Sequence, residues 1–145
     1  MITFHNITEK DANELSRLDE ECFSSPWSEH SFLNEAKNPL AQYVIAKSDE
    51  EIIGYAGYWQ VIDEGQITNI AVLKDYRRKG IAHKMLERLI KKAKEMKITV
   101  LSLEVRESNI PAINLYEKFG FKKIGTRKDY YKNPKENAIL MDLVL

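Results

Sequence analysis

The stretch QITNIAVLKDYRRKGIAHKML, residues 66–86, predicts a strand, a basic turn and the start of a helix in direct succession. From Ile81 to Met96, apolar residues recur at three- and four-residue spacing, which is typical of an amphipathic helix. The free N–H groups and the positive dipole end of that helix would point at whatever lies beyond the strand. The arrangement therefore favours an anion-binding site at the turn.

The turn by itself is not specific. Gly80 removes a side chain where a phosphate would approach the backbone, and Ala82 keeps the next inward position small. The P-loop pattern G-x-x-x-x-G-K-[ST] and the dinucleotide pattern G-x-G-x-x-G are both absent. Since [QR]-x-x-G-x-[GA] is short enough to occur by chance, a basic turn ahead of a helix with no ligand remains an alternative at this point.

Outward from this stretch, the apolar patterns alternate between strand and helix along the chain. Ser28 is a predicted helix N-cap, either Ser108 or Asn109 caps the last helix, and Gly120 ends it. Short turns between residues 42 and 73 favour an antiparallel meander. Strands are expected at 1–7, 42–48, 51–63, 64–73, 99–105, 121–131 and 136–145, and helices at 10–23, 29–36, 81–96 and 108–120. This order predicts an α/β domain with a mixed sheet covered by helices.

Composition limits the class of protein. The 145 residues fit a single domain spanning residues 1–145. The 22 basic and 22 acidic residues cancel, which argues against a protein that mainly neutralises nucleic-acid phosphates. No apolar run approaches the roughly 20 residues of a membrane helix, and no signal peptide precedes the first strand. A cytoplasmic protein without a nucleic-acid or membrane partner is expected.

Cysteine and histidine usage indicates no metal site. Cys22 is the only cysteine, so no internal disulfide forms, and its register with Leu15 and Leu18 predicts a buried apolar role. The three histidines, His5, His30 and His83, lack metal-ligand spacing to one another or to Cys22. Neither zinc nor iron is therefore expected.

Six longer stretches, which follow one another along the chain, are more specific than the turn alone. They are PWSE with Phe32 behind it, NIAV, YRRKGIA, LEVRESNIPAINLYEKFGF, DYY and NAILM. Through them the whole chain resembles the GNAT family of N-acetyltransferases, most closely the RimI branch that acetylates the N-terminal alanine of a small-subunit ribosomal protein. The resemblance implies a mostly antiparallel twisted sheet of about seven strands flanked by about four helices. It also implies acetyl-coenzyme A (acetyl-CoA) as the acetyl donor.

The resemblance assigns coenzyme contacts residue by residue. Backbone groups of the strand before the turn would hold the pantetheine arm and the thioester, and the basic turn with the first helical turn would hold the pyrophosphate. Asn109 would reach the coenzyme from the next helix. Ala82 stands where many members have glycine, a change that the family tolerates. The expected contacts are Ile70, Ala71, Val72, Arg77, Arg78, Lys79, Gly80, Ile81, Ala82, His83 and Asn109.

The same resemblance makes Glu104 the general base and Tyr116 the general acid. On its own terms, Glu104 interrupts the apolar run TVLSLEV and shares a strand face with Val100 and Ser102. A carboxylate there is costly unless it is near water or useful. Without the resemblance, simple exposure at the strand end would be the preferred explanation of Glu104, and Tyr116 would be a core aromatic residue on the face of Ile113.

The implied reaction is direct transfer from the thioester to an amine, with proton removal either direct or through water. An α-amino group titrates near 8 and a lysine near 10.4, so using the neutral lysine at pH 7 costs on the order of 3 kcal/mol more. A protein N-terminus is therefore the favoured acceptor. Trp27, Asn69 and Tyr131 are the predicted acceptor-binding residues. Trp27 and the Tyr130–Tyr131 pair could wall an extended peptide slot, and packing of these rings within the fold is the alternative.

Two other functions remain open from the sequence. The acceptor could be another amine, namely an internal lysine, a polyamine or an antibiotic. The chain could also be a non-catalytic acyl-CoA-binding module, although the paired Glu104 and Tyr116 count against that alternative.

Overall fold

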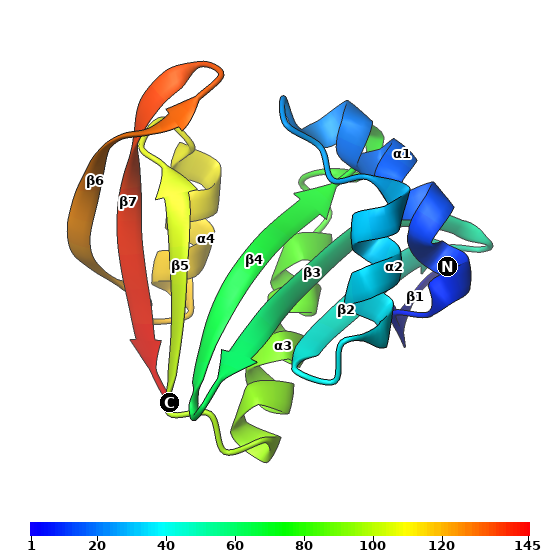
Figure 1. Ribbon diagram of the computed structural model, residues 1–145, viewed down its shortest axis with the longest axis horizontal. Coiled ribbons are helices and arrows are strands. Elements are labelled where there is room, and N and C mark those ends of the chain that lie inside the picture. Colours follow the sequence, from blue (N-terminus) through cyan, green and yellow to red (C-terminus); the bar gives the residue numbers. More distant parts are fainter. The chain divides into compact units, whose positions relative to one another are not determined.

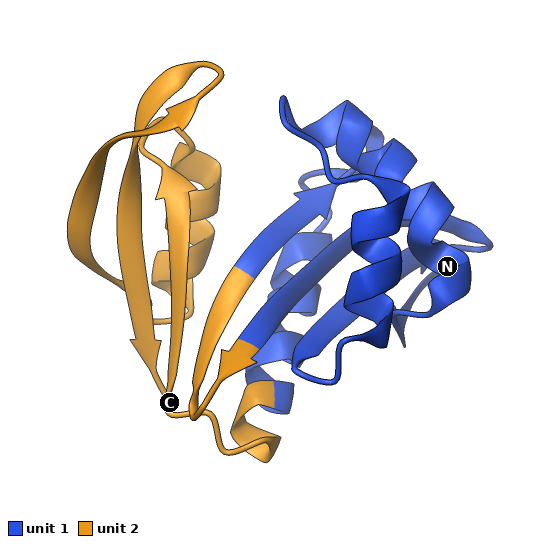
Figure 2. Ribbon diagram, viewed as in Figure 1, with its two compact units in different colours: residues 1–59, 68–92 blue, residues 60–67, 93–145 orange.

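The computed structural model describes all 145 residues, Met1 to Leu145. They form two compact units (Figure 2). Unit 1 comprises residues 1–59 and 68–92, and unit 2 comprises residues 60–67 and 93–145.

The elements follow the predicted order closely, with ends shifted by one or two residues at most positions. The strands are β1 Ile2–Asn6, β2 Ala41–Ser48, β3 Glu51–Val61, β4 Glu64–Val72, β5 Val100–Arg106, β6 Lys122–Lys132 and β7 Lys135–Val144. The α-helices are α1 Ala12–Cys22, α2 Glu29–Lys37, α3 Ile81–Glu95 and α4 Ile110–Lys118, and the two short 3-10 helices are η1 Glu9–Asp11 and η2 Lys74–Tyr76. No helix is both long and apolar enough to cross a membrane.

The seven strands form a mixed sheet in the order β1-β2-β3-β4-β5-β7-β6. In unit 1, β2 pairs antiparallel with β1 and β3. In unit 2, β7 pairs antiparallel with β5 and β6, while β4 pairs parallel with β5 from Glu64 opposite Val100 to Gln66 opposite Ser102. The predicted α/β fold with a mixed, mostly antiparallel sheet is confirmed.

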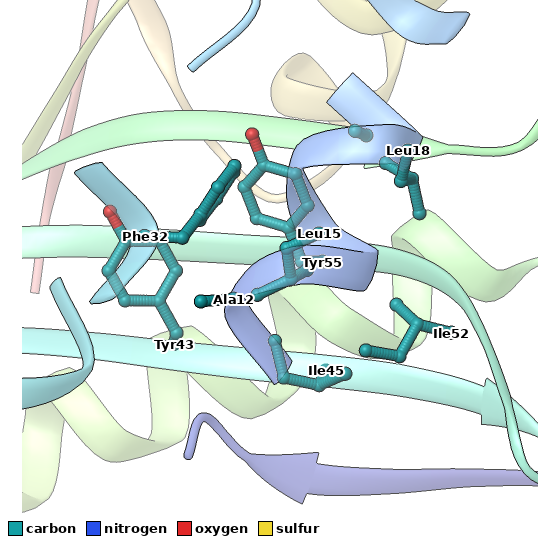
Figure 3. Packing of buried hydrophobic residues seen from close by; sticks show 9 residues of the cluster. Ala12, Leu15, Leu18, Phe32, Tyr43, Ile45, Ile52 and Tyr55 are labelled. Carbon is teal, nitrogen blue, oxygen red and sulfur yellow. The ribbon is translucent and has the colours of Figure 1, made fainter. Parts of the chain in front are cut away.

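The core of unit 1 combines helical aliphatic residues with three aromatic rings. In Figure 1, α2 lies on the near face of β2 and β3, and α3 lies on their far face. Figure 3 shows Phe32 of α2 beside Tyr43 and Tyr55, with the aliphatic side chains of α1 next to them. The buried cluster is Ala12, Leu15, Leu18, Phe32, Tyr43, Ile45, Ile52, Tyr55 and Ala71. Cys22 is partly buried against this cluster, in line with its predicted apolar role.

Local signals set the helix ends. The Ser28 hydroxyl accepts a hydrogen bond from the Ser31 N–H at 3.1 Å, and the Asn109 side chain accepts one from the Ala112 N–H at 3.3 Å. Gly120 has φ +99°, a left-handed conformation that glycine adopts without steric cost. The predicted caps are confirmed, and Asn109 rather than Ser108 caps α4.

Two boundaries differ from the prediction for identifiable reasons. The first helix was expected to begin at residue 10, whereas Thr8 and Asp11 form a capping box around η1, so that α1 begins at Ala12. The last two strands pair with register shifts between Lys123 and Gly125 and between Arg127 and Tyr131. Because a β-bulge changes which face a side chain occupies, simple alternation fails along β6.

Candidate active site

In unit 1, the turn between β4 and α3 has the geometry of a helix N-terminus left open to an anion. Arg78 has φ +62° and Gly80 has φ +76°, so the backbone passes twice through the left-handed region. A Cβ atom on Gly80 would meet no atom within 4 Å. The Gly80 carbonyl accepts the first bond of the helix from Lys84 N–H at 3.1 Å. The backbone N–H groups that precede Lys84 have no carbonyl of the preceding turn to bond to, so they can donate to a ligand.

The basic residues of this turn have different partners. The Nε of Arg77 donates to the Val72 carbonyl at 2.8 Å, which ties the turn back to the end of β4. The ammonium of Lys79 lies 5.3 Å from the centre of the Tyr76 ring, and the Arg78 side chain is exposed. Arg77 therefore shapes the turn, and the basic charge facing solvent comes mainly from Arg78 and Lys79.

The strand residues before the turn offer backbone rather than side chains. The side chains of Ala71 and Val72 are buried, at 4% and 9% exposure, and Ile81 at the start of α3 is 4% exposed. Ile70 and Ala82 are half-buried, and His83 is exposed on the first turn of α3. This arrangement fits the expectation that backbone groups of this strand contact the coenzyme. The contact of each individual residue remains a prediction.

Two predicted acceptor residues, Trp27 and Asn69, also belong to unit 1. Trp27 is partly buried, with its ring 5.4 Å from Phe32 and stacked on Trp59 at 6.3 Å, centre to centre. The side-chain amide of Asn69 donates to the Tyr55 hydroxyl at 3.3 Å. The packing alternative for Trp27 is thus present in the structure, and a peptide-binding role for it stays a prediction.

In unit 2, Glu104 occupies the polar face of β5. Leu101, Leu103 and Val105 are buried, and Glu104 alternates with them. Its Oε1 lies 3.9 Å from an Arg127 guanidinium nitrogen, whereas its Oε2 is buried and has no hydrogen-bond partner. A buried carboxylate oxygen without a donor is unusual, and it leaves an acceptor ready for a donor group from a ligand.

Three tyrosines are electrostatically coupled to Glu104 or to one another. Interaction with the Glu104 carboxylate, followed by burial, raises the pKa of Tyr130. Burial, followed by the charge of Glu104, raises the pKa of Tyr131 to about 12. Burial, followed by the charge of Tyr131, raises the pKa of Tyr116 well above the usual 10.0. Glu104, Tyr116, Tyr130 and Tyr131 therefore lie in one connected group of unit 2, and their roles in the reaction stay predictions.

Tyr116 is also a core residue. It is 7% exposed on α4, and its ring lies 5.6 Å from that of Phe121. Its raised pKa keeps the hydroxyl protonated across the neutral range, as proton donation requires. Core packing and proton donation are compatible roles for this one side chain.

Arg106 was missed by the sequence reasoning. Its guanidinium donates to the carbonyls of Pro134 at 2.9 Å and Asn133 at 3.0 Å, and it pairs with Glu136 at 3.2 Å. It also lies 4.3 Å from the centre of the Tyr131 ring. Arg106 thereby fastens the β6–β7 turn and the Tyr131 ring to β5. Arg106 lies opposite Ala138 in the β5–β7 pair, two residues from Glu136, so its contacts depend on the pairing of strands that are distant in sequence.

The remaining predicted coenzyme residue is Asn109. Its side-chain oxygen is engaged as the cap of α4, which leaves its amide nitrogen as the group able to reach a ligand. No group of three or more His, Cys, Asp or Glu side chains is arranged to hold a metal ion.

Comparison with known proteins agrees with this geometry. Residues 12–121 match the model of the acetyltransferase (GNAT) family. A ribosomal protein bS18-alanine N-acetyltransferase of Haemophilus ducreyi is 38% identical, over 96% of this chain and 97% of the relative. The chain therefore belongs to the GNAT family of acetyltransferases.

Solved structures show the same similarity. The crystal structure of the Escherichia coli ribosomal-protein-S18-alanine N-acetyltransferase has a TM-score of 0.91 and 32% identity, covering 99% of this chain and 94% of that one. A chain of the NatC complex, crystallised with a Gag peptide and CoA, has a TM-score of 0.87 and 25% identity, covering 99% and 98%.

Proposed function

We propose that this chain is an acetyl-CoA-dependent N-terminal acetyltransferase that acts by direct transfer, with the N-terminal alanine of ribosomal protein bS18 as its acceptor. The whole chain, residues 1–145, would act as one catalytic domain in the cytoplasm, with no nucleic-acid or membrane partner. The observation that carries the proposal is the buried, unpartnered Oε2 of Glu104 beside a group of tyrosines. We infer the acceptor from the similar proteins, which are named for acetylation of the alanine of this ribosomal protein.

The coenzyme would occupy the β4–turn–α3 segment. Open space over Gly80 and the first-turn N–H groups of α3 fit a pyrophosphate, and Arg78 and Lys79 add positive charge. Ile70, Ala71 and Val72 would offer backbone groups to the pantetheine arm. Arg77 would act through the shape of the turn, because its Nε is bonded to Val72. Bound acetyl-CoA supplies an activated acetyl thioester, so no metal is needed for the transfer proposed.

Glu104 would accept the proton that the attacking amine loses. Its Oε1 faces Arg127, which leaves Oε2 as the acceptor for the amine or for an intervening water. Tyr116 would supply the proton to the departing thiolate. A thiol has a pKa of about 8.5, so this donation assists a leaving group that is already acceptable.

The first test replaces the base. Glu104→Gln keeps the size of the side chain but removes the proton acceptor, so kcat should fall by about 10²–10⁴-fold at neutral pH. Glu107→Gln is the matched control, because Glu107 is exposed just beyond the same strand and should leave the rate unchanged. Initial rates with an alanine-starting bS18 peptide measure both. Full activity of Glu104→Gln would refute the assignment of the base.

The second test concerns the acceptor. An alanine-starting peptide should be acetylated, whereas the same peptide with a blocked N-terminus should not, since the α-amine is the proposed nucleophile. Consumption of acetyl-CoA and peptide mass report the two results. Activity that survives the block would favour an internal lysine, and coenzyme binding without turnover on any amine would favour a non-catalytic module.

A further inference from the structure

Asp19 is a fully buried carboxylate to which the proposed reaction assigns no part. It lies on α1 and its relative exposure is 0%. Burying a carboxylate costs free energy unless hydrogen bonds compensate. Burial indeed raises the pKa of Asp19, while bonds from Trp27 and Tyr55 oppose the rise. The groups that donate hydrogen bonds to this carboxylate are therefore held in fixed positions around it.

The hydrogen bonds of Asp19 lead to two predicted acceptor-binding residues. Its Oδ2 accepts from the backbone N–H of Trp27 at 2.8 Å, and its Oδ1 accepts from the Tyr55 hydroxyl at 2.6 Å. The Tyr55 hydroxyl in turn accepts from the Asn69 amide at 3.3 Å. One carboxylate therefore connects α1, the α1–α2 loop, β3 and β4 within unit 1.

Aromatic contacts fix the other end of Trp27. Its ring stacks on Trp59 with an interplanar angle of 17°, and it contacts Phe32, which meets Tyr55 edge-on at 5.4 Å. These ring contacts place the side chain, but they involve no backbone atom of the loop. The bond from the Trp27 N–H to Asp19 is directional, and it sets where the loop backbone lies.

We propose that Asp19 is a positioning residue for acceptor binding, holding the Trp27 loop directly and Asn69 through Tyr55. The inference rests on the proposed function, because it assumes that Trp27 and Asn69 border the acceptor. Asp19 itself touches no reacting group. Loss of its bonds should therefore weaken the acceptor peptide and leave the coenzyme and the chemistry of Glu104 intact.

Two substitutions on β3 form a matched pair. Tyr55→Phe removes the hydroxyl that joins Asp19 to Asn69. Tyr58→Phe removes another fully buried hydroxyl of the same strand, one that has no hydrogen-bond partner. Asp19→Asn is the third variant, since its amide nitrogen cannot accept the bond that the lost carboxylate oxygen accepted. Thermal unfolding of each variant confirms that it is folded at the assay temperature.

Kinetics and spectroscopy are measured together. Tyr55→Phe and Asp19→Asn should raise the peptide KM by about tenfold, the effect of losing a hydrogen bond to a charged group. The acetyl-CoA KM and the pH profile of kcat should stay as in the wild type. Because Trp27 and Trp59 are the only two tryptophans, their near-ultraviolet circular dichroism reports the loop directly, and it should weaken in both variants. Tyr58→Phe should change neither quantity.

The outcomes separate the inference from the proposed function. If the wild type acetylates no alanine-starting peptide, the proposed function fails, and the tryptophan signal alone then decides whether Asp19 holds the loop. An unchanged peptide KM and an unchanged tryptophan signal in both Tyr55→Phe and Asp19→Asn would overturn the inference. So would an equal rise in the KM of acetyl-CoA, which would indicate general damage to the fold.

Discussion

At the scale of single residues, Tyr116 and Tyr58 are both buried, but their hydroxyl groups have different surroundings. Tyr58 is buried with an unpartnered hydroxyl, whereas Tyr116 lies where the charge of Tyr131 reaches it. Burial raises the pKa of both, to about 12 for Tyr58. A phenol that stays protonated to high pH is a reliable proton donor but a weak acid, so its contribution to the rate should be modest.

Tyr116→Phe should therefore lower kcat by about 10–100-fold, near the lower limit for general acid catalysis, with the KM of acetyl-CoA unchanged. The wild-type kcat should show no loss from ionisation of Tyr116 below about pH 10, because burial holds the pKa of this group above its ordinary value. Rates between pH 6 and pH 10, with Tyr58→Phe as the control, measure both effects. A fall in wild-type kcat with a midpoint near pH 8 would contradict this assignment of the acid.

At the scale of elements, the approach of β3 to β4 depends on a missing side chain. A Cβ atom on Gly54 would lie 2.7 Å from the carbonyl oxygen of Ala71 and 3.3 Å from the terminal methyl of Met85. The methionine can move, but the backbone oxygen can do so only if β4 moves. Ala71 belongs to the segment assigned to the coenzyme, so the spacing of the two strands links stability to binding.

Gly54→Ala should lower the free energy of unfolding by about 1–3 kcal/mol, as expected for overpacking, and should raise the KM of acetyl-CoA. Gly125→Ala is the matched control, because its Cβ would lie 3.6 Å from Leu140, an ordinary contact. Urea unfolding and initial rates compare the two variants. Equal stability losses for both would show that Gly54 is not limited by Ala71.

At the scale of the whole molecule, the raised pKa values of the tyrosines lead us to expect a loss of stability at alkaline pH. The pKa is raised for Tyr43, Tyr55, Tyr58, Tyr116, Tyr130 and Tyr131, which are six of the seven tyrosines. Above pH 10 the unfolded chain loses phenolic protons that the folded chain keeps, so proton release favours unfolding. The sign is therefore a loss of stability as pH rises.

The urea midpoint should fall between about pH 9 and pH 11, and the phenolate absorbance of the buried tyrosines should rise in one cooperative step together with the loss of circular dichroism. Spectrophotometric titration alongside circular dichroism measures both. Gradual titration of Tyr43, Tyr55, Tyr58 and Tyr116 at pH 10 with the fold intact would contradict the burial of these four side chains.

Much of the fold follows from short-range patterns. The caps at Ser28 and Asn109 and the helix stop at Gly120 depend on residues a few positions away, and the alternation around Glu104 shows that its face differs from that of Leu103 and Val105. The β6 register could not be predicted in this way. Its bulges arise from pairing with β7, a contact between strands that the sequence of β6 does not encode alone.

The residues of the candidate site also fall into two groups, those that the sequence predicts and those whose partners only the structure shows. Glu104, Tyr116 and Tyr131 were predicted as site residues from the family resemblance and its motifs, and all three lie in unit 2. The bond from Arg77 to Val72 and the hold of Arg106 on the β6–β7 turn were not foreseen. A long basic side chain can serve a ligand or a carbonyl equally well, and only its position in the fold shows which partner is within reach.

The basic turn at residues 77–80 illustrates the division. By itself, the sequence determined the strand, the turn and the helix, because periodicity and glycine conformation are local properties. Only the tertiary structure decided that Arg77 faces the strand and that Asp19 holds Trp27 and Tyr55. Hydrogen bonds between residues far apart in the chain exist only once packing has brought their atoms within about 3 Å.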